Sequence, residues 1–353
     1  MPIGVGVLGF AHGHVNAYLM QWRANPDMGI TPVAAWDHDG GRLSATAAQF
    51  EMETIAEADA LLARDDIQAV VIASETSMHA DLAEKAAAAN KAIIVQKPMA
   101  LTMSQADRMV AAVAAHGVPF TMAWQMRTDP QNIQMRELVR SGALGKVFMV
   151  RRRHGLGMCL NPESAAVWHM NPVYNRDIFA DDASHPIDMI HWMLGVPATV
   201  TAEIETLFDP SMPSDNGIAL FRYPGGPIAE VSCSFTTTGA LNTTEIIAEK
   251  GTVVQDYGDG PSCGVPRPEG AVGLKWYLAE QGDWVYSDIA SPPGHGDRIH
   301  GLARPLAEFL HGERPPIATA EEGRISLRML LACYVSSREG RRVRIDDEAV
   351  TRV

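Results

Sequence analysis

The stretch GVLGFAHGHVNAYL, residues 6–19, follows a few apolar residues and leads into a sequence of helical character. A glycine-rich turn between a first strand and a first helix is where dinucleotide-binding domains hold a pyrophosphate. The literal pattern G-x-G-x-x-G occupies residues 4–9, which coincide with the expected strand 3–8 and leave no loop to cradle a ligand. We therefore predict that the working turn spans residues 9–14.

This turn reads Gly-x-Ala-x-x-His where the usual pattern has three glycines. Gly9 supplies the tight turn, and Ala11 still permits close approach of the backbone with one more methyl group. The N-terminal amides of the following helix then face the pyrophosphate, and a histidine can donate a hydrogen bond to phosphate or be purely structural. The predicted cofactor loop consists of Gly9, Phe10, Ala11, His12, Gly13 and His14.

Asp37 follows the second expected strand, 31–36. Dinucleotide-binding folds carry an acidic residue roughly 20 residues beyond the turn, where it binds the hydroxyls of the adenosine ribose. A carboxylate there also repels a 2′-phosphate, so the sequence favours NAD over NADP. The alternative is that Asp37 only caps a surface helix.

The first third of the chain alternates short apolar runs with helical patterns. The expected strands are 3–8, 31–36, 67–73, 92–95 and 119–123, and the expected helices are 14–25, 41–50, 79–89 and 104–116. Such alternation indicates βαβ units and a parallel sheet whose strands are buried on both faces. We predict an N-terminal Rossmann domain over residues 1–123.

The pattern changes beyond residue 123. Strand candidates with alternating polarity occur at 146–152, 199–206, 218–223, 228–234, 245–248, 252–255 and 274–278, and helices are expected at 132–141 and 321–338. Pro224, Gly225 and Gly226 separate two of these strands and indicate a hairpin turn. The prediction is an α/β protein whose second domain, residues 124–353, is α+β with an open, mainly antiparallel sheet.

Composition excludes several classes of function. The 353 residues carry a net charge of −13, whereas nucleic-acid binding needs clustered Lys and Arg. Arg151, Arg152, Arg153 and His154 form a local exception, which we interpret as a partly solvated strand face. We expect neither a nucleic-acid nor a membrane partner, because no apolar run approaches the ~20 residues of a membrane span.

The cysteines are widely spaced and form no C-x-x-C pair. They are Cys159, Cys233, Cys263 and Cys333. This spacing predicts neither a zinc site nor a disulfide framework, so we expect no bound metal and a reducing compartment. The N-terminus has no basic segment of the kind that opens a signal peptide, and we expect a cytoplasmic protein.

Four motifs resemble the glucose–fructose oxidoreductase and inositol dehydrogenase family, Gfo/Idh/MocA. They are SETSMH (74–79), VQKPMALT (95–102), SGALGKV (141–147) and FADDASHPIDMIHWMLG (179–195). The resemblance covers nearly the whole chain and matches its domain order. It implies an NAD-dependent dehydrogenase acting on CH–OH groups of a sugar, cyclic polyol or sugar derivative. The open sheet offers a face for self-association, so we expect a homodimer or homotetramer.

The resemblance assigns catalytic roles to three residues, Lys97, Asp181 and His185. Oxidising an alcohol requires a base for the hydroxyl proton, and histidine, with an ordinary pKa near ~6.5, suits that task. Lys97 can stabilise the developing alkoxide. Asp181 can fix the tautomer of His185, although Asp182 and Asp188 are alternatives for this role.

The resemblance implies further contacts with cofactor and substrate. The cofactor residues outside the turn are Ser74, Thr76, His79, Gln96, Lys97, Trp124 and Gln125. The substrate residues are His154, Trp168, Tyr174 and Arg176. The departures from the family include Gln96, which replaces a glutamate, Glu75, which stands where proline is frequent, and the segment 175–179, which replaces a glycine-rich turn.

Other functions use the same residues. An NAD-dependent glycosidase oxidises its substrate transiently, eliminates and reduces again, without net NADH. A reductase of an imine, enone or diol is a second alternative. A non-catalytic cofactor-binding regulator is the third, and the presence of both Lys97 and His185 argues against it.

Overall fold

The structure is a computed structural model that describes residues 2–239, 242–256 and 269–353. Within this range the chain divides into two compact units. The first comprises the residues up to Gln125, together with Val173–Asn175 and Ile299–Leu327. The second comprises Met126–Pro172, Arg176–Arg298 and Arg328–Val353, so two segments that follow residue 123 belong to the first unit. Cys263 lies outside the described residues.

The first unit is built on a six-stranded parallel sheet with the order β3-β2-β1-β4-β5-β6. Its strands are β1 (Ile3–Leu8), β2 (Ile30–Trp36), β3 (Glu53–Thr54), β4 (Ala69–Ile72), β5 (Ala92–Val95) and β6 (Phe120–Met122). The central strands are apolar and buried on both faces, as covered parallel strands must be. The predicted Rossmann architecture is therefore confirmed.

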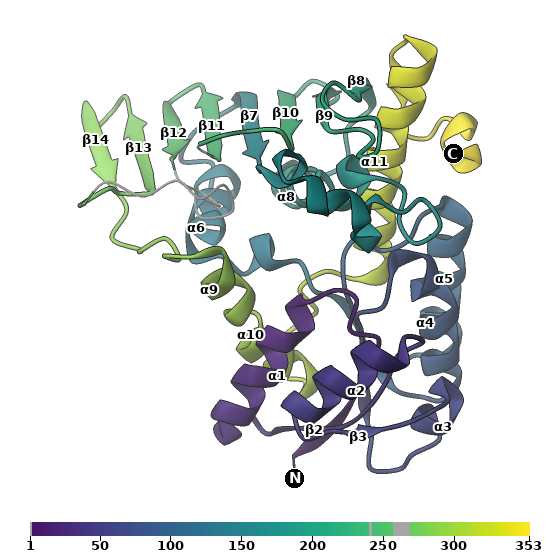
Figure 1. Ribbon diagram of the computed structural model, residues 1–353. Coiled ribbons are helices and arrows are strands. Elements are labelled where there is room, and N and C mark those ends of the chain that lie inside the picture. The colour runs from purple at the N-terminus through teal and green to yellow at the C-terminus, as the bar shows by residue number, and fades with distance from the viewer. Residues whose placement is uncertain (1, 240–241, 257–268) are drawn as a thin grey trace. The chain divides into compact units, whose positions relative to one another are not determined.

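Helices connect and cover this sheet (Figure 1). They are α1 (His14–Ala24), α2 (Gly40–Gln49), α3 (Ala58–Leu62), α4 (His79–Ala88), α5 (Met103–His116) and, from the later segment, α10 (Ala303–Leu310). Trp22 of α1 donates from Nε1 to the carbonyl of Ala303, 2.9 Å away, and Thr121 of β6 accepts from the amide of Ile317. These contacts join residues 299–327 to the first unit.

The glycines of β1 explain the misleading literal motif. A Cβ atom at Gly4 would lie 1.8 Å from the carbonyl oxygen of Asp66, and one at Gly6 would lie 2.7 Å from the Leu61 side chain. Both glycines therefore allow neighbouring segments to approach the strand. They meet a packing requirement within the sheet and not a requirement for phosphate binding.

The second unit contains a nine-stranded sheet with the order β14-β13-β12-β11-β7-β10-β9-β8-β15. The strands are β7 (Val147–Gly155), β8 (Thr199–Glu205), β9 (Asn216–Arg222), β10 (Ile228–Ser234), β11 (Thr243–Ala248), β12 (Gly251–Gln255), β13 (Leu274–Leu278), β14 (Asp283–Tyr286) and β15 (Val343–Arg344). All neighbours are antiparallel except β7 and β10. This mainly antiparallel sheet confirms the predicted class of the second domain.

The strands of this sheet alternate in burial. Arg151 and Arg153 of β7 are exposed, whereas Arg152 and His154 are buried, so the basic run is a solvated face only at alternate positions. The turn at Tyr223–Pro227 joins β9 to β10 through a hydrogen bond from the amide of Gly226 to the carbonyl of Tyr223. The hairpin expected there is confirmed.

Helices of the second unit include α6 (Pro130–Arg140), α7 (Ile178–Asp182) and α8 (Ser184–Leu194). Two further helices belong to it in part: α9 (His295–His300) up to Arg298, and α11 (Ala320–Glu339) from Arg328 onward. Ser336 and Ser337 of α11 accept hydrogen bonds from the amides of Ala202 and Ile204 on β8. These hydroxyls satisfy strand amides next to the sheet edge, where pairing with β15 is short.

Cys159, Cys233 and Cys333 are buried free thiols. In the described part of the chain, none of the helices combines the length and the apolar character needed to cross a membrane.

Candidate active site

The turn after β1 has one position that only glycine can occupy. Gly9 has a φ of +88°, and a Cβ atom there would lie 2.5 Å from the Cα of Ser74. Gly13, which precedes α1, has an ordinary φ of −59°, and a Cβ atom there would meet nothing within 4 Å. The steric constraint on the turn therefore falls on its first residue.

Three backbone contacts fix the path of the turn. The amide of Gly9 donates to the carbonyl of Trp36 at 2.7 Å, and the amide of His12 donates to the carbonyl of Ala73 at 2.8 Å. The amide of Phe10 donates to Oδ2 of Asp37 at 2.7 Å. The loop is thus held against the carboxyl ends of β2 and β4, and the first turn of α1 follows directly, as an anion-binding turn requires.

The side chains of the turn differ in exposure. Phe10 and His12 are buried, Ala11 and His14 are half-buried, and Gly13 is exposed. The rings of His12 and His14 meet edge to face, with centroids 4.4 Å apart. The two histidines therefore form one packed pair at the start of α1.

Asp37 is buried, and its carboxylate is an integral part of the turn. Arg42, on the first turn of α2, contacts both of its oxygens at 2.7 Å. Arg42 was not among the predicted site residues, although an arginine five residues after the acid and at the start of the next helix was a usable signal. The burial of Asp37 and its bond to Phe10 exclude the alternative of a surface cap.

His79 joins two loops that the resemblance assigns to the cofactor. Its Nε2 lies 3.1 Å from the carbonyl oxygen of Ser74, and its Nδ1 lies 3.1 Å from that of Pro98. Burial lowers the pKa of His79, and the hydrogen bonds to these carbonyls oppose that shift only partly. The His79 imidazole thus lies between the loop after β4 and the loop that carries Lys97, and in its neutral form it can donate to only one of the two carbonyls.

Two buried oxygen atoms in this region have unused hydrogen-bonding capacity. Gln96 donates from Nε2 to the hydroxyl of Tyr18 at 2.7 Å, but its Oε1 has no hydrogen-bond partner within the described residues. Oγ1 of Thr76 likewise has no hydrogen-bond partner among the described residues. Buried polar atoms normally have partners, so these two oxygens fit a ligand that brings hydroxyl or amide donors, as the ribose and nicotinamide of NAD do.

The remaining predicted cofactor residues are enclosed. Lys97, Trp124 and Gln125 have relative exposures of 3%, 2% and 3%. Lys97 follows β5, and the other two follow β6, at the carboxyl edge of the parallel sheet where such folds bind nucleotides. A buried lysine is unusual and marks this loop as a candidate functional site.

In the second unit, two histidines share one carboxylate. His154 of β7 lies with Nε2 2.7 Å from Oδ2 of Asp182, and His185 of α8 lies with Nε2 3.8 Å from Oδ1 of the same residue. The two imidazole centroids are 6.5 Å apart. Asp182, one of the alternatives to Asp181, thus lies between a predicted acid/base and a predicted substrate contact.

The other two carboxylates of this segment contact different residues. Asp181 places Oδ1 3.3 Å from Nδ1 of His169, whose ring stacks on Trp168 at 3.9 Å. Asp188 makes a two-pronged ion pair with Arg127, with both contacts at 2.8 Å and both side chains buried. The Arg127–Asp188 pair thus connects α8 to the segment that follows β6.

Asp177 caps α7, the short helix that carries Asp181 and Asp182. It accepts from the amide of Ala180 at 2.8 Å and from the hydroxyl of Tyr334 at 2.5 Å. Burial raises the pKa of Asp177, while its hydrogen bonds oppose the rise. This cap fixes the direction in which α7 presents its two terminal carboxylates.

Arg176 and Tyr174, both predicted to contact substrate, lie in different units. The guanidinium of Arg176 lies over the ring of Tyr334, 5.2 Å from its centroid. Tyr174 belongs to the first unit, where its carbonyl accepts from the amide of Ser77 and its ring lies 6.0 Å from that of His38. In the structure, therefore, Tyr174 contacts the loop that carries Thr76.

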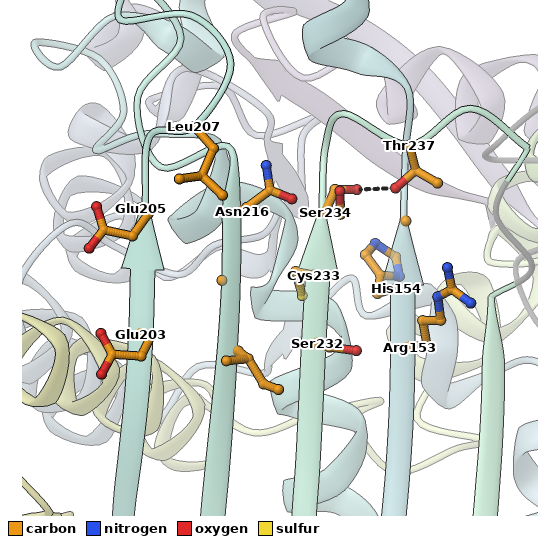
Figure 2. A pocket seen from close by; sticks show the side chains of 13 residues that line it. Arg153, His154, Glu203, Glu205, Leu207, Asn216, Ser232, Cys233, Ser234 and Thr237 are labelled. Carbon is orange, nitrogen blue, oxygen red and sulfur yellow. Dashed lines mark hydrogen bonds between the residues drawn. The ribbon is translucent and has the colours of Figure 1, made fainter.

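A cavity of about 430 Å³ opens at one end of the second sheet. It is formed by the carboxyl ends of β7, β8 and β10 and the start of β9, and Figure 2 shows His154 and Cys233 on neighbouring strands there. Glu203, Glu205, Asn216 and Ser234 supply polar groups. His154 therefore borders the cavity while its ring contacts Asp182.

Both halves of the chain match models of one protein family. The model described as "Oxidoreductase family, NAD-binding Rossmann fold" matches residues 3–124, and the GFO/IDH/MocA C-terminal domain matches residues 132–254. Together these matches cover more than half of the chain.

Curated relatives and solved structures agree with this match. The chain is 25% identical to D-apiose dehydrogenase of Paraburkholderia graminis, over 97% of this chain and 88% of that protein. It is 26% identical to an inositol 2-dehydrogenase of Rubrobacter xylanophilus, over 96% and 92%. Among solved structures, levoglucosan dehydrogenase in complex with NADH and levoglucosan has a TM-score of 0.86 at 18% identity, covering 98% of this chain and all of that one, which shows the shared fold.

The turn fixed by Gly9, the buried acid at Asp37 and the two family matches lead to one conclusion. The chain belongs to the Gfo/Idh/MocA family of NAD-binding oxidoreductases.

Proposed function

We propose that this protein transfers hydride between NAD and a ring carbon of a sugar, cyclic polyol or sugar derivative. The relatives named D-apiose dehydrogenase and inositol 2-dehydrogenase support this substrate class. The observation that carries the proposal is the pair of histidines, His154 and His185, on the carboxylate of Asp182. An alcohol oxidation needs such a buried group to take up the hydroxyl proton.

NAD, when bound, supplies the acceptor for the hydride. Oε1 of Gln96 and Oγ1 of Thr76 are the atoms that would accept hydrogen bonds from it, and Asp37 would bind the adenosine ribose. His79 holds the loops of Ser74 and Lys97 together, so it acts by positioning.

We assign to His185 the role of accepting the hydroxyl proton of the substrate. The Asp182 carboxylate stabilises the imidazolium that forms when His185 accepts the hydroxyl proton. The resemblance gave this supporting role to Asp181, but Asp182 has the contacts that suit it, whereas Asp181 faces His169. Asp181 then acts electrostatically on His169.

We propose that Lys97 interacts with the substrate oxygen that loses its proton. Its ammonium group stabilises the negative charge that develops as the hydroxyl loses its proton, an effect that strengthens where water is excluded. Its burial suits this task. His154, Trp168, Tyr174 and Arg176 are proposed to contact the hydroxyls of the substrate.

The test is a screen of NADH absorbance with the purified protein. Inositols, aldoses, anhydrosugars and glycosides are each incubated with NAD, and the products are analysed by chromatography. The proposal predicts net NADH together with an oxidised sugar or polyol. Cleavage of a glycoside without net NADH would instead establish the glycosidase, and binding of NAD with no turnover of any class would establish a regulator.

We also propose a cytoplasmic homodimer or homotetramer. One face of the second sheet carries exposed apolar residues, among them Met149, Ile218, Leu220 and Trp284. Apolar sheet faces of this kind serve as interfaces between subunits, and the buried free thiols suit a reducing compartment. Light scattering coupled to gel filtration measures the mass of the assembly in solution. A Leu220→Glu variant, which places a charge on this face, is expected to form a smaller assembly.

A further inference from the structure

The carboxylate of Asp37 is fully occupied by the chain's own donors. Oδ2 accepts from the amide of Phe10 and from Nε of Arg42, and Oδ1 accepts from the amide of Asp39 and from Nη2 of Arg42. A carboxylate has about four acceptor positions, so ribose hydroxyls reach Asp37 only if one of these donors leaves. The two amides are fixed in the backbone, whereas Arg42 is a flexible, partly exposed side chain.

Glu75 offers Arg42 a second anchor. Oε1 of Glu75 accepts from Nη2 of Arg42 at 2.9 Å, and Oε2 lies 2.9 Å from Nε2 of His38. The Glu75 side chain is 2% exposed, so its charge needs these partners. Arg42 is therefore held between two buried carboxylates and remains attached to Glu75 when it gives up Asp37.

The charges of this cluster disfavour a further anion. Asp37 and Glu75 carry two negative charges, and Arg42 carries one positive charge. A guanidinium at this position is the group that typically binds the 2′-phosphate of NADP. Here, the guanidinium contacts Asp37 through Nε and Nη2 and Glu75 through Nη2, so Glu75 adds a second carboxylate that competes with a phosphate for this donor.

We propose that Glu75 is a specificity-determining residue that maintains the preference for NAD by holding Arg42 away from a 2′-phosphate. The inference deepens the proposed function, since it concerns the cofactor site of the same enzyme. Asp37 recognises the ribose hydroxyls, and Glu75 prevents Arg42 from recognising their phosphorylated form. The discrimination between NAD and NADP is thus shared between Asp37 and Glu75, which lie on different loops.

The test compares the dissociation constants of NAD and NADP by titration calorimetry, with no substrate present. We expect the wild-type chain to prefer NAD. Glu75→Gln keeps the shape of the side chain but removes its charge, and it should shift the ratio of the two constants toward NADP by about tenfold, the effect of one charge-assisted hydrogen bond. The double variant Glu75→Gln/Arg42→Gln should lose that gain, because the phosphate-binding group is gone.

The matched control is Glu53→Gln, which removes an exposed carboxylate of the first unit that pairs with Arg64 and has no contact with Arg42. It should leave the ratio unchanged. Glu75→Asp retains the charge, but its shorter side chain withdraws that charge from Arg42. It should therefore shift the ratio of the NAD and NADP constants in the same direction as Glu75→Gln, by a smaller factor. This variant replaces Glu75→Gln in the test if Glu75→Gln is too unstable to titrate.

Three results would overturn the inference: equal binding of both dinucleotides by the wild type, an unchanged ratio in both Glu75 variants, or a gain that persists in the double variant. Failure of the proposed dehydrogenase activity is a separate result, because it leaves these binding constants unaffected.

Discussion

The cofactor turn of the first unit and the carboxylate–histidine cluster of the second unit are determined in different ways. The turn is fixed by backbone: Gly9 has a positive φ and no room for a Cβ atom, and three amides fix the loop. The cluster is fixed by side chains, because Asp182 reaches His154 and His185 from the end of a five-residue helix.

This difference explains why the cofactor turn is easier to predict from the sequence than the carboxylate–histidine cluster. A backbone constraint demands a particular residue at a particular position, whereas adjacent carboxylates at a helix end point in different directions according to helix phase. The predictions below therefore test the two sites separately, beginning with the largest expected effect.

His185→Ala should lower turnover by about 10²–10⁴-fold, the usual contribution of a general base. Binding of NAD should remain within about twofold. NADH absorbance with the substrate found in the screen measures the first, and calorimetry measures the second. His116→Ala, at the end of α5 and exposed, is the control. Turnover that survives in His185→Ala would remove His185 from the mechanism.

Gly9→Ala should weaken NAD binding by about tenfold or more. The variant places a side chain in the left-handed region, at a cost of about 1–2 kcal/mol, and its methyl group meets Ser74. Gly13→Ala should bind NAD nearly as the wild type does, since its added methyl group meets nothing. Equal effects of the two substitutions would show that the steric constraint is not where we place it. Thermal melting separates lost binding from lost folding.

His79 should make stability depend on pH. Its pKa is lowered in the folded chain by burial, so the unfolded chain binds a proton first as the pH falls below about 6.5. The free energy of unfolding should therefore decrease with acidification, by at most about 1.4 kcal/mol per pH unit from this group. Urea unfolding between pH 8 and pH 5 measures the slope, and His79→Asn should flatten it. Identical slopes in the two proteins would refute this role.

The sequence allowed the fold class, the turn and the family to be predicted. The signals were local: apolar periodicity, a glycine after the first strand and short motifs. The two-residue strand β3 was not predicted because its residues are exposed and too few to show a period. The return of residues 299–327 to the first unit depends on long-range contacts such as that of Trp22 with Ala303, which leave no local pattern.

The site was predicted less completely than the fold. The motif FADD contains two adjacent carboxylates, and only the geometry of α7 and α8 separates the partner of His169 from the partner of His185. Arg42 was missed because a charged residue at the start of a helix is usually a solvated one. Its ion pairs with Asp37 and Glu75 become visible only in three dimensions.

Asp182 is proposed to join His154 and His185 into the group that accepts the hydroxyl proton. The most direct test is the pH dependence of kcat and kcat/KM in Asp182→Asn and Asp181→Asn, with NAD affinity measured in parallel. We expect Asp182→Asn to lower kcat by about tenfold or more and to displace the pH profile, with unchanged NAD affinity, whereas Asp181→Asn should have the smaller effect. A larger loss and a displaced profile in Asp181→Asn, with Asp182→Asn close to wild type, would contradict this proposal.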